Sequence, residues 1–510
     1  MTQTRERSQY GTPLPAGRDH GTPQPAAAYG MMLAAFLGLL LAARLVALRY
    51  NGTDLFFDEA QYWSWSRELT FGYYSKPPLI AWLIRAFTET CGVSEACVRM
   101  PSALLHTATA AVIFLLARRL YDGQVGFWSG LTYATLPGVS LSAGIISTDV
   151  PLLFFWAVAL LALLRLMDGK AWWPALMLGV AIGLGLNAKY AMALFVLCLG
   201  VYLIATPERR WLLSDPRLWA ALAIGVALIT PNLLWNWLNS FATFSHTADN
   251  AKWGGSLLKP LKALEFFGSQ FGVFGPILFA SLGVVAMRAW RSGAPDADRI
   301  LLAFALPIIA LFTIQAFLSR AHANWGATAY VAGTVVVVAT LVRDLSWRWL
   351  KASLALHVAL ALLLAVAVAQ AGGFRLPGAG DPFQRTLGWK ALAEETRKVV
   401  GEARRQKQGY AAVLTDDRSV TAELLYYLRD EAVEILAWRA TGRPRDHYEL
   451  TRPFSARTGS PVLLVTLKPD PGPLLARFET VRLVAERQVP AGLGKPRRVR
   501  FYALSGYKPQ

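Results

Sequence analysis

The sequence predicts a polytopic α-helical membrane protein with a small α/β domain at its C-terminal end, and three observations support this. Apolar runs of about 20 residues recur between residues 30 and 370, and such runs cross a bilayer as helices because only internally hydrogen-bonded backbone is stable in lipid. Charged residues make up only 16% of the chain, against about 25% in soluble domains. After residue 371 charges become frequent and apolar runs shorten, which indicates a separate water-facing domain.

The apolar runs define a membrane domain at residues 29–371, which we expect to contain about 11–13 transmembrane helices. A polar tail rich in Pro and Gly, residues 1–28, precedes this domain and is predicted to be disordered. The spans that can be placed individually are at residues 30–48, 100–117, 125–147, 150–166, 172–187, 190–206, 218–236, 266–287, 300–318, 326–342 and 350–371.

The C-terminal segment, residues 372–510, alternates helical and strand patterns in the way that is typical of a small α/β domain. Helices are expected at residues 389–407 and 418–429. Strands are expected at residues 410–414, 433–437, 461–467, 481–487 and 499–503.

The distribution of Lys and Arg predicts the orientation of the spans. Basic residues gather in short loops that alternate along the chain, and the positive-inside rule makes the side of those loops cytoplasmic, together with the N-terminal tail. The same bias explains the net charge of +18 without a nucleic-acid partner. The long loop at residues 49–99 and the C-terminal domain then lie on the opposite side.

Polar residues that interrupt apolar sequence gather on that opposite side, although none of them was used to set the orientation. Charges so close to membrane spans are costly unless they have partners or a function. Their position on one face therefore predicts a single functional site. These residues are Asp58, Glu59, Lys76, Asp149, Lys189, Arg320 and His322.

The first loop contains an acidic pair, Asp58 and Glu59, followed by aromatic residues and by Lys76. The carboxylates suit a general base and its neighbour, or an N-terminal cap for the helix that follows, and both roles can coexist. The Lys76 ammonium suits a lipid phosphate, or it extends to lipid headgroups. Aromatic residues such as Tyr62 and Tyr74 form interfacial belts, and they also stack on sugar faces.

Two further groups interrupt later spans. Asp149 and Lys189 lie at tight turns between apolar segments, so they either pair with each other or line a polar cavity. The stretch Arg320–Trp325 offers a cation, the His322 imidazole, the Asn324 amide and an aromatic ring, a set that suits an anionic ligand or an interfacial anchor.

Other motifs limit the chemistry. The sequence has no P-loop and no dinucleotide-binding glycine pattern, so an ATP-driven or dinucleotide mechanism is unsupported. Cys91 and Cys97 lie in the same loop and form either a disulfide or two free thiols.

The order of several motifs resembles a known family. DEAQYW, YYSKPPLIAWL, STDVPLLFFW, NAKY and HANWGATAY follow one another over about residues 30–340. This pattern is similar to the GT-C membrane glycosyltransferases of the protein O-mannosyltransferase and aminoarabinose transferase group.

The resemblance implies an inverting transferase of the bacterial inner membrane, with a cytoplasmic N-terminus and a periplasmic C-terminal domain. A sugar would move from a polyprenyl-phosphate donor to lipid A, core oligosaccharide or another envelope glycan at the periplasmic face. Asp58 and Asp149 are the predicted catalytic residues. The predicted donor- and acceptor-binding residues are Glu59, Tyr62, Tyr74, Lys76, Lys189, Tyr190, Arg320, His322, Asn324 and Trp325.

One departure from the family pattern concerns metal binding. The aminoarabinose transferases carry an acidic residue beside the lysine, linked to a metal site, whereas this chain has Ser75 there. We therefore expect chemistry without a metal or other cofactor, in a protein that acts as a monomer among membrane lipids. The alternatives are a protein O-mannosyltransferase and a transporter or flippase of lipid-linked sugar.

Overall fold

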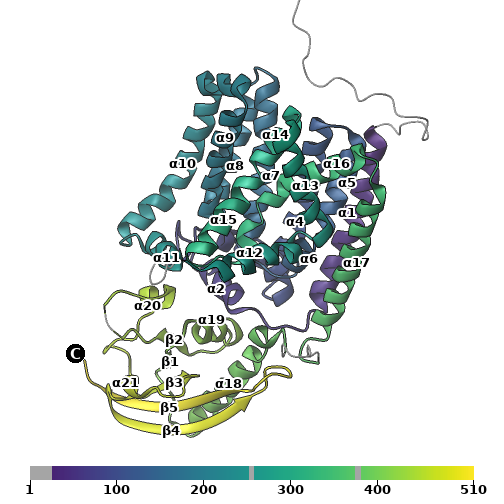
Figure 1. Cartoon of the computed structure of the whole chain (residues 1–510). Helices are drawn as coiled ribbons and strands as arrows, with labels where there is room; N and C mark the ends of the chain where they lie inside the picture. The colour runs from purple at the N-terminus through teal and green to yellow at the C-terminus, as the bar shows by residue number, and fades with distance from the viewer. Residues whose placement is uncertain (1–25, 252–257, 374–380, 441, 510) are drawn as a thin grey trace, which may run out of the picture.

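The computed structural model describes residues 26–251, 258–373, 381–440 and 442–509. It has two parts, a helical bundle and a small domain built on one sheet, which lies below the bundle in Figure 1. The tail predicted at residues 1–28 lies outside the described residues except for its last three residues, which belong to the first helix.

The bundle contains a helix at each of the individually predicted spans. Its helices and short 3-10 helices are α1 (Ala26–Arg49), α2 (Phe57–Ser66), α3 (Leu79–Cys91), α4 (Glu95–Leu120), α5 (Gly123–Thr135), α6 (Pro137–Ser142), α7 (Asp149–Asp168), α8 (Trp173–Ala188), η1 (Tyr190–Ala193), α9 (Leu194–Ala205), η2 (Pro207–Ser214), α10 (Pro216–Leu238), α11 (Ala242–Ala251), α12 (Pro260–Val273), α13 (Pro276–Ser292), α14 (Asp296–Ala303), α15 (Leu306–Leu318), η3 (Ala323–Gly326), α16 (Ala329–Arg343) and α17 (Trp347–Ala369).

The sequence predicted about 11–13 transmembrane helices, but fewer of the helices in the bundle are long enough to cross a bilayer alone. Within the described residues, six helical stretches are long and apolar enough, and a seventh qualifies if α12 and α13 count as one span. These two helices meet at an angle of 113°, because Gly275 has a φ of 92° and Pro276 cannot continue the hydrogen-bond ladder of α12. Pro137 likewise separates α5 from α6 within the predicted span 125–147.

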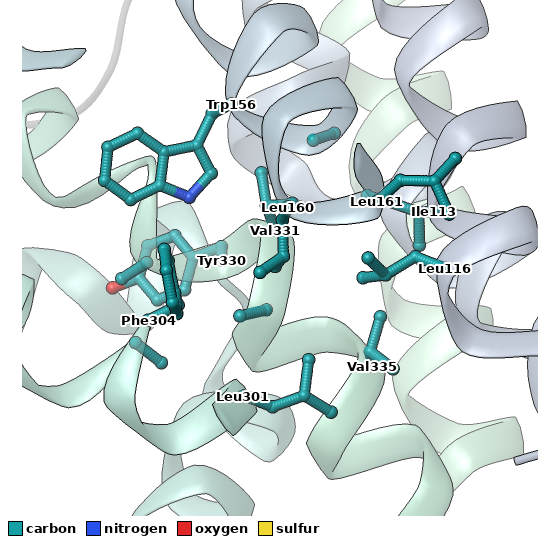
Figure 2. Packing of buried hydrophobic residues seen from close by; sticks show 14 of the residues in the cluster. Ile113, Leu116, Trp156, Leu160, Leu161, Leu301, Phe304, Tyr330, Val331 and Val335 are labelled. Atoms are coloured by element: carbon teal, nitrogen blue, oxygen red, sulfur yellow. The ribbon is translucent and has the colours of Figure 1, made fainter. Parts of the chain in front are cut away.

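The core of the bundle surrounds α7. In the most apolar 18-residue stretch of this helix, 72% of the residues are buried. Figure 2 shows Trp156 and Leu160 of this helix against Phe304, Tyr330 and Val331. α8 packs closely on α10, since a Cβ atom added at Gly179 would lie 2.6 Å from a backbone oxygen of α10. Helix α7 also packs along α8, and the end of α7 that carries Asp149 adjoins the end of α8 that precedes Lys189.

The C-terminal domain has the two helices and five strands that its sequence predicted, and three short helices that were not predicted. In chain order, these elements are η4 (Gln384–Thr386), α18 (Trp389–Arg405), β1 (Ala412–Thr415), α19 (Arg418–Tyr427), β2 (Glu434–Ala437), α20 (His447–Thr451), β3 (Val462–Thr466), α21 (Gly472–Leu475), β4 (Phe478–Val489) and β5 (Arg497–Tyr507). The sheet order is β2-β1-β3-β5-β4, parallel from β2 to β3 and antiparallel from β3 to β4.

The C-terminal domain and the first loop share one hydrophobic core. Helix α19 packs on α2, with the rings of Tyr426 and Trp63 edge to face at 4.9 Å. The backbone N–H of Leu55 donates to the Tyr427 hydroxyl over 3.0 Å, and the Trp389 N–H donates to Asp54 over 2.8 Å. The loop and the domain therefore lie on the same side of the bundle, at the junction visible in Figure 1. A disulfide joins Cys91 and Cys97 within the loop.

Candidate functional site

Glu59 fixes the start of α2 and is fully buried. Its carboxylate accepts hydrogen bonds from Arg99, from the backbone N–H of Ile146 over 2.9 Å and from the N–H of Phe56 over 2.9 Å. Both oxygens are engaged, and the charge is matched by Arg99, which is 1% exposed. Glu59 therefore performs the capping role and also ties α2 to α4, which leaves it no free atom for a substrate.

Asp58 precedes Glu59 on the first turn of α2 but points into a more open space. Its side chain is 38% exposed, and its Oδ1 accepts a hydrogen bond of 2.8 Å from Arg418 of the C-terminal domain. Its Oδ2 has no hydrogen-bond or ion-pair partner among the described residues. Asp58 thus has one oxygen held and the other available to take a proton.

Asp149 and Lys189 form an ion pair of 2.6 Å at the adjoining ends of α7 and α8. The second oxygen of Asp149 accepts from the Asn324 amide over 2.7 Å. Both side chains remain partly accessible, at 12% for Asp149 and 20% for Lys189. The first of the two sequence alternatives is therefore confirmed, because these residues pair with each other.

The loop that carries Lys76 is anchored to α10 and α11. The Asn232 amide donates to the backbone oxygen of Phe71 over 2.7 Å, and the Thr243 hydroxyl donates to that of Tyr73 over 2.7 Å. Gly72 lies so close to Trp235 that an added Cβ would be 2.4 Å from the indole. This close approach leaves the loop little freedom at the point where it presents the lysine.

Lys76 is partly buried and makes no ion pair within the described part of the chain. Burial lowers the pKa of its ammonium, and the positive charges of Lys189 and Arg418 lower it further, while Asp58 and Asp149 oppose this. These residues are its electrostatic neighbours, so the structure brings the predicted charges together. An unpaired cation in such surroundings is a place for an anion.

Tyr62 is an electrostatic neighbour of Asp58 and Asp149. Its side chain is only 4% exposed. Burial raises the pKa of its hydroxyl well above the usual range, and the charges of Asp58 and Asp149 add to this. The hydroxyl therefore remains a proton donor at any physiological pH.

Tyr74 and Tyr190 make structural contacts at the margin of this region. The Tyr74 hydroxyl donates to the backbone oxygen of Pro444 in the C-terminal domain over 2.9 Å. The Tyr190 hydroxyl donates to Asn232 over 2.7 Å, and its ring stacks on Phe244. Each of them joins segments that frame the site.

The stretch Arg320–Trp325 covers the end of the bundle beside Asp149. The pKa of the His322 imidazole is lowered by burial and by the positive charges of Arg320 and Lys189, so this ring is neutral near pH 7. The Nε of Arg320 is buried and has no hydrogen-bond partner among the described residues. Trp325 packs against His322 and Phe312.

Sequence reasoning did not single out three residues that the structure places here. Arg418 contacts Asp58, Arg385 lies over the Phe56 ring at 5.0 Å, and His246 of α11 is an electrostatic neighbour of Lys76. Burial lowers the pKa of His246 to about 4, with Lys76 and Arg418 adding to the effect. One signal was available for Arg418, because it follows the parallel strand β1, and the carboxyl ends of such strands often carry functional groups.

Metal-ligating side chains do not cluster in the described residues. Over these ranges no group of three or more His, Cys, Asp and Glu side chains is placed to hold an ion. Ser75, next to Lys76, adds a hydroxyl where a carboxylate would suit a metal better.

A separate cleft of about 650 Å³ opens between α2 and the C-terminal domain. It is lined by Trp63, Arg67, Arg429, His447 and Arg452, among others, and does not include Asp58 or Lys76. The polar site described above is therefore distinct from this cleft.

Comparison with known proteins identifies the family. Residues 75–235 match the family model described as dolichyl-phosphate-mannose-protein mannosyltransferase. The chain is 37% identical over 464 residues to the lipid A galacturonosyltransferase RgtD of Rhizobium johnstonii, covering 91% of this chain and 95% of that protein. It is 28% identical over 298 residues to the lipopolysaccharide core galacturonosyltransferase RgtA of the same organism, covering 56% and 59%.

Solved structures share the fold. ArnT from Cupriavidus metallidurans in the apo state superposes with a TM-score of 0.64 at 18% identity, covering 95% of this chain and all of ArnT. ArnT bound to undecaprenyl phosphate gives the same TM-score at 16% identity. With a mostly helical membrane part, a small C-terminal sheet domain and a relative that it matches over almost its whole length, this chain belongs to the GT-C family of multi-pass membrane glycosyltransferases that includes the lipid A galacturonosyltransferases.

Proposed function

We propose that this protein transfers a sugar from a polyprenyl-phosphate donor to lipid A or a related envelope glycan, at the periplasmic face of the bacterial inner membrane. The observation that carries the proposal is the presence of a carboxylate and an ammonium that are electrostatic neighbours and are not fully satisfied. Asp58 has one oxygen without a partner, and Lys76 has no counter-ion among the described residues. The free carboxylate oxygen of Asp58 can accept a proton, and the ammonium of Lys76 can bind a phosphate. The near full-length relative named for lipid A supports this acceptor.

The transfer is a single displacement. Asp58 Oδ2 takes the proton from the acceptor hydroxyl while the hydroxyl oxygen forms a bond to the anomeric carbon. The bond from that carbon to the phosphate oxygen breaks, and its electron pair leaves with the polyprenyl phosphate. Lys76, with Lys189 nearby, stabilises the charge on the leaving group. Attack from the face opposite the phosphate inverts the anomeric configuration.

Asp149 supports this chemistry without taking the proton. Both of its oxygens are engaged, one by Lys189 and one by Asn324. It therefore orients the Lys189 ammonium toward the donor. Tyr62 is a proton donor near Asp58 and Asp149, and its hydroxyl suits a sugar hydroxyl or a phosphate oxygen.

The charge of the site favours a donor with more than one negative group. The site has two carboxylates, Asp58 and Asp149, and a larger number of cations. These cations are Lys76, Lys189, Arg320 and Arg418. A polyprenyl-phosphate diester carries one negative charge, and a uronic acid adds a second. The names of both galacturonosyltransferase relatives agree with a carboxylated sugar. We therefore propose a hexuronic acid as the transferred sugar, and we propose that no divalent metal is needed.

The test is transfer by the purified protein in lipid vesicles, with a polyprenyl-phosphate uronic acid and lipid A as substrates. Mass spectrometry should show lipid A gaining one hexuronate, and chelation of divalent metals should not change the rate. Asp58→Asn should lower the rate about 100-fold or more, the usual contribution of a general base. Asp168→Asn is the matched control, because this exposed carboxylate pairs with Arg119 at the other end of α7.

Other outcomes would redirect the proposal. Asp58→Asn with wild-type activity contradicts the role of Asp58. Glycosylation of a peptide instead of lipid A indicates the protein O-mannosyltransferase function that the family model describes. Movement of the donor across the vesicle without a new glycosidic bond indicates a transporter.

A further inference from the structure

The C-terminal domain contributes a charged group directly to the site. Arg418 is the first residue of α19, and its Nη1 donates to Asp58 Oδ1 over 2.8 Å and to the Gln61 side-chain oxygen over 2.9 Å. Its guanidinium lies 4.9 Å from the centre of the Phe57 ring. Asp58, Gln61 and Phe57 are all on α2, so one arginine contacts a whole turn of the helix that carries the proposed base.

The helix that carries Arg418, α19, is held at both ends. Asp417 caps α19 by accepting from the Ser419 N–H over 2.8 Å. The other end of α19 is held by Tyr427, whose hydroxyl accepts from Leu55 and donates to Glu95 over 2.6 Å. The guanidinium therefore projects from a rigid helix that is already packed against α2.

Arg418 determines which oxygen of Asp58 is available. A carboxylate rotates freely about its Cβ–Cγ bond unless hydrogen bonds hold it. Arg418 holds Oδ1 and leaves Oδ2 without a partner in the described structure. Without Arg418, the unpaired ammonium of Lys76 is an alternative partner for Asp58, since the charge of Asp58 already acts on it. A pair between Asp58 and Lys76 would occupy the base and the phosphate-binding cation together.

From this geometry we propose that Arg418 is a positioning residue of the transferase reaction. It holds Asp58 with one oxygen directed to the acceptor and keeps it apart from Lys76. The C-terminal domain is thereby a part of the catalytic unit. The inference rests on the proposed function, because it assigns Arg418 a role in the step in which Asp58 takes the proton.

The experiment compares Arg418→Ala and Arg418→Lys with a matched control, Arg452→Ala, in the vesicle assay. Arg452 also crosses from the C-terminal domain to the first loop, where it pairs with Glu68, but it does not contact Asp58. Misplacing a catalytic group by about 1 Å can cost about 100-fold in rate. We therefore expect kcat to fall about 10- to 100-fold in Arg418→Ala, with the KM of the donor changed less than about twofold.

The conservative and control variants separate positioning from a structural role. Arg418→Lys retains one charged donor and should recover part of the lost kcat. Added guanidinium ion should raise the rate of Arg418→Ala and leave Asp58→Asn unchanged. Arg452→Ala should keep the wild-type kcat. These kinetic readouts compare folded protein, which unfolding temperature and retention in the membrane establish for each variant.

Three results would overturn the inference. The first is a wild-type kcat in Arg418→Ala. The second is an equal loss in Arg452→Ala, which would mean that domain docking alone matters. The third is a loss confined to the KM of a uronic acid donor, which would mean that Arg418 binds the sugar carboxylate. If the wild-type protein itself transfers no sugar, the proposed function fails instead, which is a different and distinguishable result.

Discussion

Lys76 lies in a region where positive charges outnumber negative ones, and this has a consequence for pH dependence. Burial and the neighbouring cations lower the pKa of its ammonium from the usual 10.5. The folded protein therefore loses this charge at a lower pH than a free lysine would. Because the neutral amine no longer attracts a phosphate, the KM of the donor should begin to rise at a lower pH than the usual lysine pKa would imply.

Lys76→Arg tests this expectation. A guanidinium stays charged throughout the alkaline range, so the rise in the KM of the donor should disappear in this variant. The measurement is the KM of the donor from pH 7 upward. Lys390→Arg, at an exposed position on α18, is the control and should keep the wild-type profile. An unchanged alkaline rise in Lys76→Arg would mean that another group titrates.

The residue scale also shows what the sequence could and could not predict. Asp58 and Lys76 were visible because a charge beside an apolar span is unusual. Arg418 was not, since it is one arginine in a domain where charged residues are frequent. Its place after strand β1 marks it only weakly, because its role depends on a contact between residues 360 positions apart.

At the scale of elements, a buried ion pair helps to hold α2 in place. Arg99 and Glu59 are both essentially inaccessible to solvent. Removing one partner of such a pair leaves an uncompensated buried charge, which typically costs about 3–5 kcal/mol. Arg99→Ala should therefore lower the free energy of unfolding by about this amount and reduce transfer, because α2 carries Asp58.

Thermal unfolding in detergent measures the effect of Arg99→Ala. The control is Arg85→Ala on α3, whose pair with Glu89 is partly exposed, and for which little change in stability is expected. A similar unfolding temperature for Arg99→Ala and wild type would show that α2 is held by its apolar contacts instead.

The elements themselves were predicted with different success. Alternating and apolar patterns placed all five strands and the helix at every individually placed span. The breaks at Pro137 and Gly275 were not predicted. An apolar run can continue across a proline, so its mean hydropathy does not reveal a bend there. The bend of 113° depends on the packing around it as much as on Gly275 and Pro276.

At the scale of the whole molecule, the first loop and the C-terminal domain form one hydrophobic cluster that includes Trp63, Tyr73, Trp389, Val413 and Tyr426. Parts of a protein that share a core open together. Trp63→Ala should therefore increase hydrogen exchange in α19 as well as in α2, although α19 is far from the substitution in sequence. Hydrogen exchange read by mass spectrometry checks this.

The expected cost of Trp63→Ala is about 3–5 kcal/mol for a buried aromatic side chain. Trp211→Ala is a suitable control, because this partly exposed side chain lies in η2, outside the cluster. Faster exchange in α2 alone would mean that the domain is stable without the loop.

The shared core also bears on how the protein is made. The first loop leaves the ribosome well before its partners in α18, α19 and the sheet, which follow the membrane helices in the sequence. The loop is therefore synthesised long before its apolar side chains can be covered. During that interval Asp58 has no Arg418 to hold it. A chain without the C-terminal domain would carry the proposed base and the lysine but not their arrangement in the folded protein, so we expect transfer to begin only after this domain has been made.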